Sequence, residues 1–280
     1  MSTAIERVRK LEGEFGPASQ LKLFPQWGSD YRGMSKSLAR SALFAVRDKR
    51  VPRERYENAV IASLQNVEIR YSGIELRQDD HDVFMQLCHM ARDEQMGSAV
   101  SITGIDALRD LKWGSSLEDY DRLRACYTRM LEGTIYVTVK GARNIRVTGS
   151  HLFQSVTAEQ GTGTVEGLTA RWTIRLNPEL AGILTGDEMT LILWARHEEL
   201  PPLAKWLYRF FATHETPFPY KAETLHMLCG SRQVDMAAFR QKLKKSLQEL
   251  VDGRFIASFS MGPKLSYLVT VTHLEQPRIG

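Results

Sequence analysis

The sequence has no apolar run near the ~20 residues that a membrane-spanning helix needs, and the stretch from Met1 to Glu14 is rich in charge. It has only three cysteines, which lie far apart at Cys88, Cys126 and Cys229. An odd number of separated cysteines in helix-like stretches is typical of buried reduced thiols rather than of a disulfide framework. These absences predict a soluble, cytoplasmic protein without a membrane anchor.

Several motifs that carry chemistry are also missing. No Gly-x-x-x-x-Gly-Lys-Ser/Thr occurs, which excludes an ATP-driven motor, and no His-x-His occurs to supply metal to a strand-nicking tyrosine. Gly161 to Thr164 is glycine-rich but lacks the remaining features of a dinucleotide-binding turn. The scattered candidates for zinc ligands lack the usual close pairs: His81, Cys88, His89, His226 and Cys229. We therefore expect no catalytic residues, no cofactor and no metal.

The positive charge is concentrated at one end of the chain. The 280 residues carry a net charge of only +4, but residues 201 to 280 contain 11 Lys or Arg and 6 Asp or Glu. The first 200 residues hold the remaining 26 basic and 27 acidic residues, so they are close to neutral. A basic region on a neutral chain suits phosphate attraction, although a solvated basic surface is the simpler alternative.

One pattern occurs twice: a short Leu-x-x-Leu helix ending in Gly, a longer amphipathic helix, and two alternating strands. The first copy has Leu108, Leu111 and Gly114, then a helix from Leu117 to Leu131, then Ile135 to Val139 before a Gly141-Ala142 turn. The second has Leu225, Leu228 and Gly230, then a helix from Met236 to Val251, then strands on either side of Gly262-Pro263. Each copy is typical of a helix-turn-helix followed by a β-hairpin. The pattern predicts an α+β fold with two tandem winged-helix domains.

Other segments complete the expected organisation. Apolar periodicity predicts helices over Lys36 to Arg47, Asp79 to Arg92 and Leu203 to His214, and Trp172, Ile174 and Leu176 predict a strand. Pro201-Pro202 favours a linker from Glu198 to Pro202. We expect a leader over residues 1–30, a first winged-helix domain over 31–197, and a second, mainly DNA-binding domain over 198–280.

The second long helix has the features of a DNA-reading helix. Met236, Phe239, Leu243, Leu247 and Leu250 share one face, so Gln241 and Lys245 lie opposite. An amide and several cations suit base edges and phosphates in the major groove. The expected DNA contacts of this unit are Arg232, Gln233, Arg240, Gln241, Lys244, Lys245, Arg254 and Lys264. The alternative is that these groups only keep a surface helix soluble.

The first unit is a weaker candidate for reading bases. Its long helix begins with Glu118, Asp119 and Asp121, which phosphate would repel, although acidic residues also suit a helix start. Basic residues surround the following hairpin turn instead. We expect phosphate or minor-groove contacts there from Lys140, Arg143 and Arg146.

A short motif lies in the leader, between Pro17 and Pro25. Gln20-Leu21-Lys22-Leu23-Phe24 resembles the Gln-Leu-x-Leu-Phe pentapeptide with which many bacterial proteins bind the replicative sliding clamp. An extended segment of this kind presents the Gln20 amide to polar groups and the Leu23 and Phe24 side chains to an apolar cleft. The predicted clamp-binding residues are therefore Gln20, Leu21, Leu23 and Phe24. The alternative is that Leu21, Leu23 and Phe24 pack on the first domain as a strand.

Several stretches together resemble the TrfA family of plasmid replication initiators. The matching stretches cover most of the chain from about residue 24 onward: Arg32-Gly33, Arg40 to Phe44, Ile61 to Ser63, Val67 to Gly73, Leu203 to Leu207 and Lys221 to Ser231. The sequence departs from the family in the length of its N-terminal region and in its middle strands. The family also carries the clamp-binding pentapeptide.

The resemblance implies a protein that binds directly repeated origin sequences, called iterons, and opens an adjacent AT-rich segment. It also implies recruitment of host DnaA and a DnaB-type helicase, binding as a monomer, and a homodimer as a regulatory form. A dimeric winged-helix transcriptional repressor has the same fold and is the alternative function.

Overall fold

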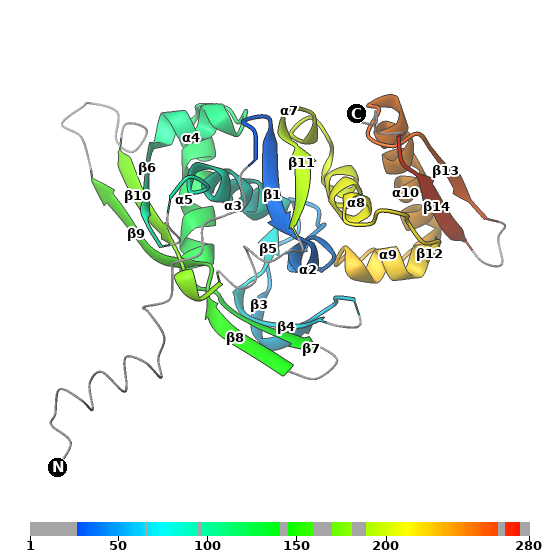
Figure 1. The fold of residues 1–280 in the computed structure, drawn as a ribbon, viewed down its shortest axis with the longest axis horizontal. Coiled ribbons are helices and arrows are strands. Elements are labelled where there is room, and N and C mark those ends of the chain that lie inside the picture. Colours follow the sequence, from blue (N-terminus) through cyan, green and yellow to red (C-terminus); the bar gives the residue numbers. More distant parts are fainter. Residues whose placement is uncertain are drawn as a thin grey trace, which may run out of the picture.

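The structure is a computed structural model that describes residues 27–64, 67–94, 97–140, 145–159, 170–180, 189–262 and 267–274. Helices and strands are mixed along the whole described chain (Figure 1). Up to the middle of the chain the elements are β1 (Tyr31–Ser35), α2 (Lys36–Ala39), β2 (Phe44–Ala45), β3 (Arg55–Ile61), β4 (Val67–Ile74), β5 (Leu76–Arg77), α3 (Gln78–Met90), β6 (Ala99–Thr103), α4 (Gly104–Asp110), α5 (Leu117–Glu132) and β7 (Thr134–Lys140). They are followed by β8 (Ile145–His151), β9 (Phe153–Glu159), β10 (Arg171–Leu176), the 3₁₀ turn η1 (Pro178–Leu180), β11 (Met189–Leu193), α7 (Trp194–His197), α8 (Pro202–Ala212), β12 (Tyr220–Lys221), α9 (Ala222–Leu228), α10 (Met236–Asp252), β13 (Ser258–Met261) and β14 (Leu268–Thr272).

The last six elements form a unit at one end of the molecule, to the right in Figure 1. In this second unit, α8, β12, α9 and α10 precede β13 and β14, and the three strands form an antiparallel sheet in the order β12-β14-β13. Pro202 begins α8, where the missing amide proton costs nothing. The Asp235 side chain accepts the amide proton of Ala237 at 2.8 Å and so caps the start of α10.

An equivalent order of elements occurs earlier in the chain. We call the described residues before α8 the first unit. In it, α3, β6, α4 and α5 are followed, after β7 and β8, by β9 and β10, and one of its sheets has the order β6-β10-β9. Ser116 and Asp119 form a capping box that begins α5. The helix–strand–helix–helix–strand–strand order is therefore repeated, with equivalent strand pairing in both copies.

The hairpin predicted after the long helix of the first copy is confirmed as β7 and β8, which pair antiparallel, but its predicted role as the equivalent of β13 and β14 is wrong. Residues Ile135 to Val139 belong to β7, which pairs with β4 and β8 in a separate four-stranded sheet of order β3-β4-β7-β8. Ile135 and Val137 are buried beside Ile69 and Tyr71 of β4, so their alternating pattern reflects burial in that sheet. The strands equivalent to β13 and β14 come later, as β9 and β10.

The helix predicted over Lys36 to Arg47 is also mostly wrong. Only α2 is helical, and the Ser41 hydroxyl donates to the carbonyl of Leu38 at 2.9 Å just after the helix ends. The chain then forms β2, which pairs in parallel with β5. The other two predicted helices are confirmed as α3 and α8, and the strand predicted from Trp172 is confirmed as β10.

Buried apolar side chains form two clusters. One draws on residues 27 to 194, and the other on Val46 and residues 200 to 271. The second cluster contains Phe239, Leu243, Leu247 and Leu250 of α10, as the periodicity predicted. The chain passes from one cluster to the other through the stretch predicted as a linker.

All three cysteines are buried and unpaired, as predicted. Burial raises the pKa of each thiol, which keeps Cys88, Cys126 and Cys229 protonated. Among the described helices, none combines the length and the apolar character required to cross a lipid bilayer.

Candidate nucleic-acid interface

The outer face of α10 carries free polar side chains. Gln241, Lys244 and Lys245 are exposed, whereas Leu243 and Leu247 on the opposite face are buried. Within the described part of the chain, these three polar side chains have no hydrogen bond or ion pair to another residue. An amide and two ammonium groups are therefore available to a ligand that approaches α10 from solvent.

Arg240 is not free in the same way. Its guanidinium donates to the Glu223 carboxylate of α9 at 2.6 Å and lies over the Tyr267 ring, 3.8 Å from the ring centroid. The hydrogen bond from Arg240 lowers the pKa of Glu223. Arg240 thus connects α10 to α9 and to the chain just before β14, so we assign it to positioning α10 rather than to direct contact.

Arg232 and Gln233 lie in the turn between α9 and α10, and both are exposed. Arg232 forms an ion pair with Glu54 of the first unit, with both side chains about half exposed. The carbonyl of Gln233 accepts from His226 Nε2 at 3.0 Å, which leaves the Gln233 amide in solvent. The turn therefore presents Gln233 outward, while Arg232 is shared with the first unit.

The remaining predicted residues are distributed over several elements. Arg254 is exposed beyond the C-terminal end of α10, with a left-handed φ of 55°. Lys140 ends β7 and Arg146 lies in β8, in the four-stranded sheet and apart from the small sheet of the first unit. Arg143, Lys264 and the pentapeptide residues 20 to 24 lie outside the described residues.

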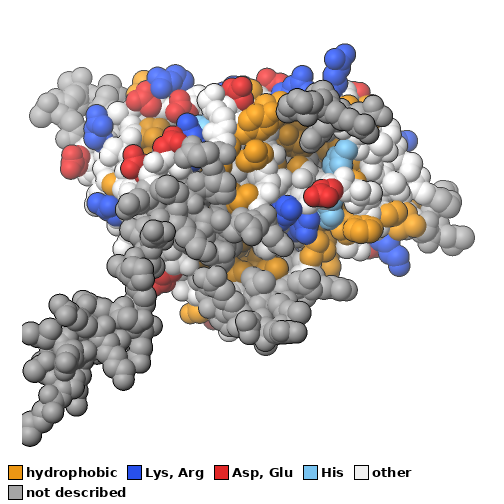
Figure 2. Space-filling view, viewed as in Figure 1, with side chains coloured by type: hydrophobic (Ala, Val, Ile, Leu, Met, Phe, Trp, Pro, Cys, Tyr) orange, Lys and Arg blue, Asp and Glu red, His pale blue; other side chains and the backbone are white. Residues whose placement is uncertain are grey.

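The outer face of α5, the equivalent helix of the first unit, has little positive charge. Glu118, Asp121 and Arg124 are exposed there, and Arg124 pairs with Asp121 at 3.0 Å. Figure 2 shows acidic and basic side chains interspersed over the part of the molecule that holds α4 and α5. A surface of mixed sign attracts phosphate weakly, so α5 is a poorer candidate for groove binding than α10.

The first helices of the two repeated patterns, α3 and α8, are joined by polar pairs that are buried or partly buried. Lys205 Nζ lies 2.5 Å from Asp82 Oδ2, and the fully buried Arg209 donates to Gln78 Oε1 at 2.8 Å. Removing either partner of such a pair would leave an uncompensated buried charge or polar group. The two units are therefore held in one arrangement.

Three buried side chains beside these pairs could hold a metal ion by geometry alone. The ligand atoms of His81, Asp82 and His197 all lie within 4.8 Å of one another. Burial lowers the pKa of both histidines, so they are neutral at physiological pH. However, Lys205 and Arg209 already bring two positive charges to this cluster, and they disfavour a divalent cation. We therefore assign the cluster to the contact between the units.

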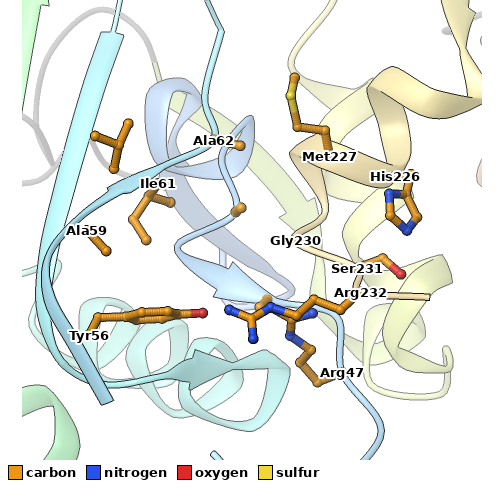
Figure 3. Close-up of a pocket in the computed structure, with 13 residues that line it drawn as sticks. Arg47, Tyr56, Ala59, Ile61, Ala62, His226, Met227, Gly230, Ser231 and Arg232 are labelled. Carbon is orange, nitrogen blue, oxygen red and sulfur yellow. The ribbon is translucent and has the colours of Figure 1, made fainter. Parts of the chain in front are cut away.

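The turn between α9 and α10 also touches the first unit. Gly230 has a left-handed φ of 67°, and a Cβ at this position would lie 3.0 Å from the Cβ of Ala45. Figure 3 shows Arg232 reaching from this turn toward Arg47 and Tyr56. The start of α10 is thus fixed against residues that precede β3.

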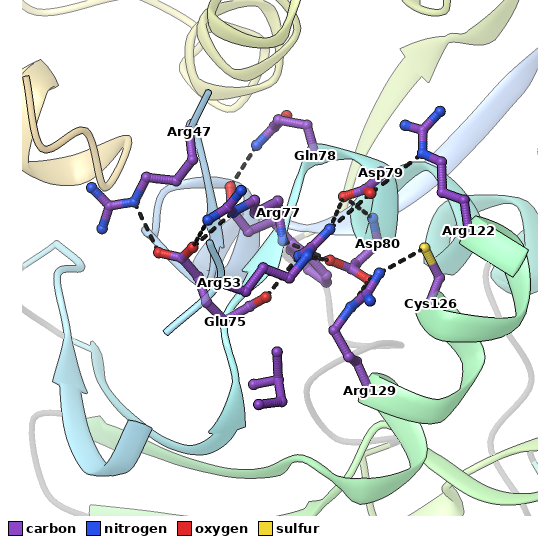
Figure 4. Close-up of polar contacts among 12 residues, drawn as sticks. Arg47, Arg53, Glu75, Arg77, Gln78, Asp79, Asp80, Arg122, Cys126 and Arg129 are labelled. Atoms are coloured by element: carbon purple, nitrogen blue, oxygen red, sulfur yellow. Dashed lines mark hydrogen bonds and ion pairs between the residues drawn. The ribbon is translucent and has the colours of Figure 1, made fainter. Parts of the chain in front are cut away.

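A network of arginines and carboxylates supports the same region from inside the first unit (Figure 4). Asp80 is fully buried and accepts from Arg53 at 2.7 Å and from Arg129 of α5 at 2.8 Å. Both carboxylate oxygens of Asp79 accept from Nη2 of Arg53 at 2.8 Å, and Oδ2 of Asp79 lies 3.4 Å from Nε of Arg122. Burial opposes ionisation of Asp79, but the charges of Arg53 and Arg122 outweigh it and lower the pKa to about 2.

This network explains why α5 has few free cations. Arg122 and Arg129 turn inward to the carboxylates of α3, and Arg122 also lies over the Trp113 ring at 3.7 Å. Arg122 and Arg129 are thus engaged by carboxylates inside the molecule. By contrast, Lys244 and Lys245 of α10 have no partner among the described residues.

The sequence profile of the family described as TrfA protein matches residues 17–264. The chain belongs to the TrfA family. A relative named plasmid replication initiator protein TrfA, from Escherichia coli, is 30% identical over 237 residues. That alignment covers 82% of this chain and 60% of the relative, so the chain spans less than two thirds of the relative's length.

Two solved structures share the fold of this TrfA-family chain. A structure of domains 2 and 3 of RctB matches with a TM-score of 0.56 and 13% identity, over 82% of this chain and 94% of that one. A second structure of RctB domains 2–3 matches with a TM-score of 0.53 and 14% identity, over 75% and 81% of the two chains. At this identity the likeness concerns the fold alone.

Sequence reasoning missed one basic segment of this TrfA-family chain. Residues 47 to 55 contain five arginines or lysines, a density that could have been noticed: Arg47, Lys49, Arg50, Arg53 and Arg55. The structure shows that Arg47 and Arg53 bind carboxylates, while Lys49 and Arg50 are exposed. Only the structure distinguishes the arginines that bind carboxylates from Lys49 and Arg50, which are exposed.

We expect Lys245→Ala to weaken DNA binding and to lower the steepness of its salt dependence by about one ion. Binding in fluorescence anisotropy at several salt concentrations measures both quantities. Arg109→Ala is the matched control, because Arg109 is exposed but already paired with Asp106 and Asp110. Equal weakening in both variants would contradict a specific contact by α10.

We expect Asp79→Asn to lower the free energy of unfolding at pH 7 by about 2 kcal/mol, because the native pKa lies well below that of an unfolded Asp. The pKa of Asp79 is lower in the folded state than in the unfolded state, so its carboxylate stabilises the fold at pH values above about 4. This stabilisation is lost as the pH falls from about 4 toward about 2. Urea unfolding at pH 7 and near pH 3 should therefore show that the difference in free energy of unfolding between the wild type and Asp79→Asn becomes smaller at the lower pH. Asp121→Asn, at an exposed pair, serves as the control; a pH-independent gap in Asp79→Asn would refute this assignment.

Proposed function

We propose that this chain is a plasmid replication initiator that binds double-stranded DNA at directly repeated origin sequences and promotes opening of the origin. The observation that carries the proposal is α10, whose apolar face is buried and whose outer face offers Gln241, Lys244 and Lys245 to solvent in a TrfA-family chain. A relative named plasmid replication initiator protein supports the same function.

In this proposal each repeated unit is a winged helix, with α10 as the helix that enters the major groove. Gln241 suits adenine, which offers both an acceptor and a donor there, and Lys245 suits guanine or a neighbouring phosphate. Because the outer face of α5 has mixed charge and attracts phosphate weakly, the first unit contributes phosphate contacts through Lys140, Arg143 and Arg146 instead. Binding energy, rather than catalysis, drives local strand opening, so the protein works without a cofactor or metal.

The proposed partners follow from the family and from the leader. Residues 20 to 24 bind the bacterial sliding clamp, and the assembled origin complex recruits DnaA and a DnaB-type helicase. A homodimer is the form that does not initiate. The protein acts in the cytoplasm, where plasmid origins are located.

We expect a footprint on directly repeated sites, with one protein on each repeat. Titration of a DNA fragment carrying one, two or three repeats should give a stepwise series of complexes in native gels. A dimeric repressor would instead protect an inverted repeat and give a single dimer complex, and that result would replace this proposal.

We expect Phe24→Ala to abolish capture of the protein on immobilised sliding clamp while leaving its DNA binding unchanged. An anchor side chain in an apolar cleft often contributes more than 2 kcal/mol, a loss of more than ~30-fold in affinity. Lys22→Ala, at the variable position of the pentapeptide, should retain binding. Undiminished capture of Phe24→Ala would remove the clamp from the proposal.

A further inference from the structure

An exposed loop of the first unit lies beside α10. It joins β2 to β3 and carries Lys49 and Arg50, both exposed, with the Arg50 side chain 92% accessible to solvent. A cleft of about 260 Å³ separates the loop from the second unit, and Lys242 and Gln233 line its other side. The loop and α10 therefore border the same stretch of surface.

The loop is held in a defined shape. The Arg77 guanidinium donates to three of its carbonyls, those of Asp48, Val51 and Pro52, at 2.9 to 3.0 Å. Asp48 Oδ1 accepts the backbone amide of Arg50 at 2.9 Å, which closes a tight turn. Side chains at the tip therefore project from a fixed backbone, which reduces the entropy lost when they bind a ligand.

The loop is also fastened to the turn that begins α10. The amide of Val46 donates to the carbonyl of Cys229 at 2.8 Å, and Glu54 at the other end of the loop pairs with Arg232. The position of Lys49 and Arg50 relative to α10 is thus set by contacts at both ends of the loop.

The two flanks of α10 meet different elements. Arg240 on one flank contacts Tyr267, next to the β13–β14 hairpin, whereas Lys242 on the other flank faces the loop. Gln241 and Lys245 lie between the flanks and point away from the core. A helix in the major groove of DNA has the phosphate backbone of one DNA strand on each side, and the groove between the two backbones is about 12 Å wide. The β13–β14 hairpin therefore lies on the side of α10 where one DNA strand would pass, and the β2–β3 loop lies on the side of the other DNA strand.

We infer that Lys49 and Arg50 bind DNA phosphates beside α10, so that the first unit completes the DNA-binding surface of the second. The exposed pair between Arg50 and Asp48, at 3.4 Å, is weak enough for phosphate to replace it. This inference rests on the proposed binding of DNA by α10. With these two contacts, full affinity for DNA requires the contact between the two units.

The test is the full chain with Lys49→Ala and Arg50→Ala combined. We expect binding to weaken several-fold for specific and random duplexes alike, because phosphate contacts carry no sequence information. The steepness of the salt dependence should fall by about two ions. The charge-conserving pair Lys49→Arg and Arg50→Lys should restore both quantities, and Arg109→Ala is again the control for loss of an exposed charge.

Unchanged affinity and salt dependence in the double alanine variant, while Lys245→Ala weakens binding, would overturn this inference and leave the role of α10 intact. Unchanged binding in both variants would overturn the proposed function as well. Circular dichroism and urea unfolding of each variant check that the substitutions, which lie on the surface, have not altered the fold.

Discussion

The burial of one apolar stripe on α10 determines what the second unit can bind. Phe239, Leu243, Leu247 and Leu250 are at most 2% exposed, and burying each such side chain contributes about 1.5–3 kcal/mol. Because helical geometry fixes the angle between side chains, burial of this stripe directs Gln241 and Lys245 to solvent. The same burial presses α10 against α8, which in turn is joined to α3 by the pairs of Lys205 and Arg209.

The two copies of the repeated unit use their basic residues differently. In the first, Arg122 and Arg129 of α5 are bound to Asp79 and Asp80, so the helix is firmly held but offers little charge to a ligand. In the second, apolar packing holds α10, and its lysines have no partner among the described residues. One topology thus provides a scaffold in one copy and a polar, cationic surface in the other.

The sequence predicted the parts of the fold that depend on local periodicity. The stripe on α10, the paired helices of both units and the buried cysteines could all be read from residue spacing. The sheet that the first hairpin joins could not, because an alternating strand such as Ile135 to Val139 does not reveal that it pairs with β4 as well as with β8. Nor could spacing show that Arg240 and Arg232 are engaged by Glu223 and Glu54, or that Arg47 and Arg53 turn inward while Lys49 and Arg50 do not. Those distinctions depend on partners distant in sequence.

The most direct measurement is a crystal structure of the full chain with a duplex carrying one origin repeat. The account predicts α10 in the major groove, with Gln241 and Lys245 within hydrogen-bonding distance of base edges or phosphates and the β2–β3 loop against the adjacent strand. A complex in which α10 lies away from the DNA, with its outer face in solvent, would contradict it.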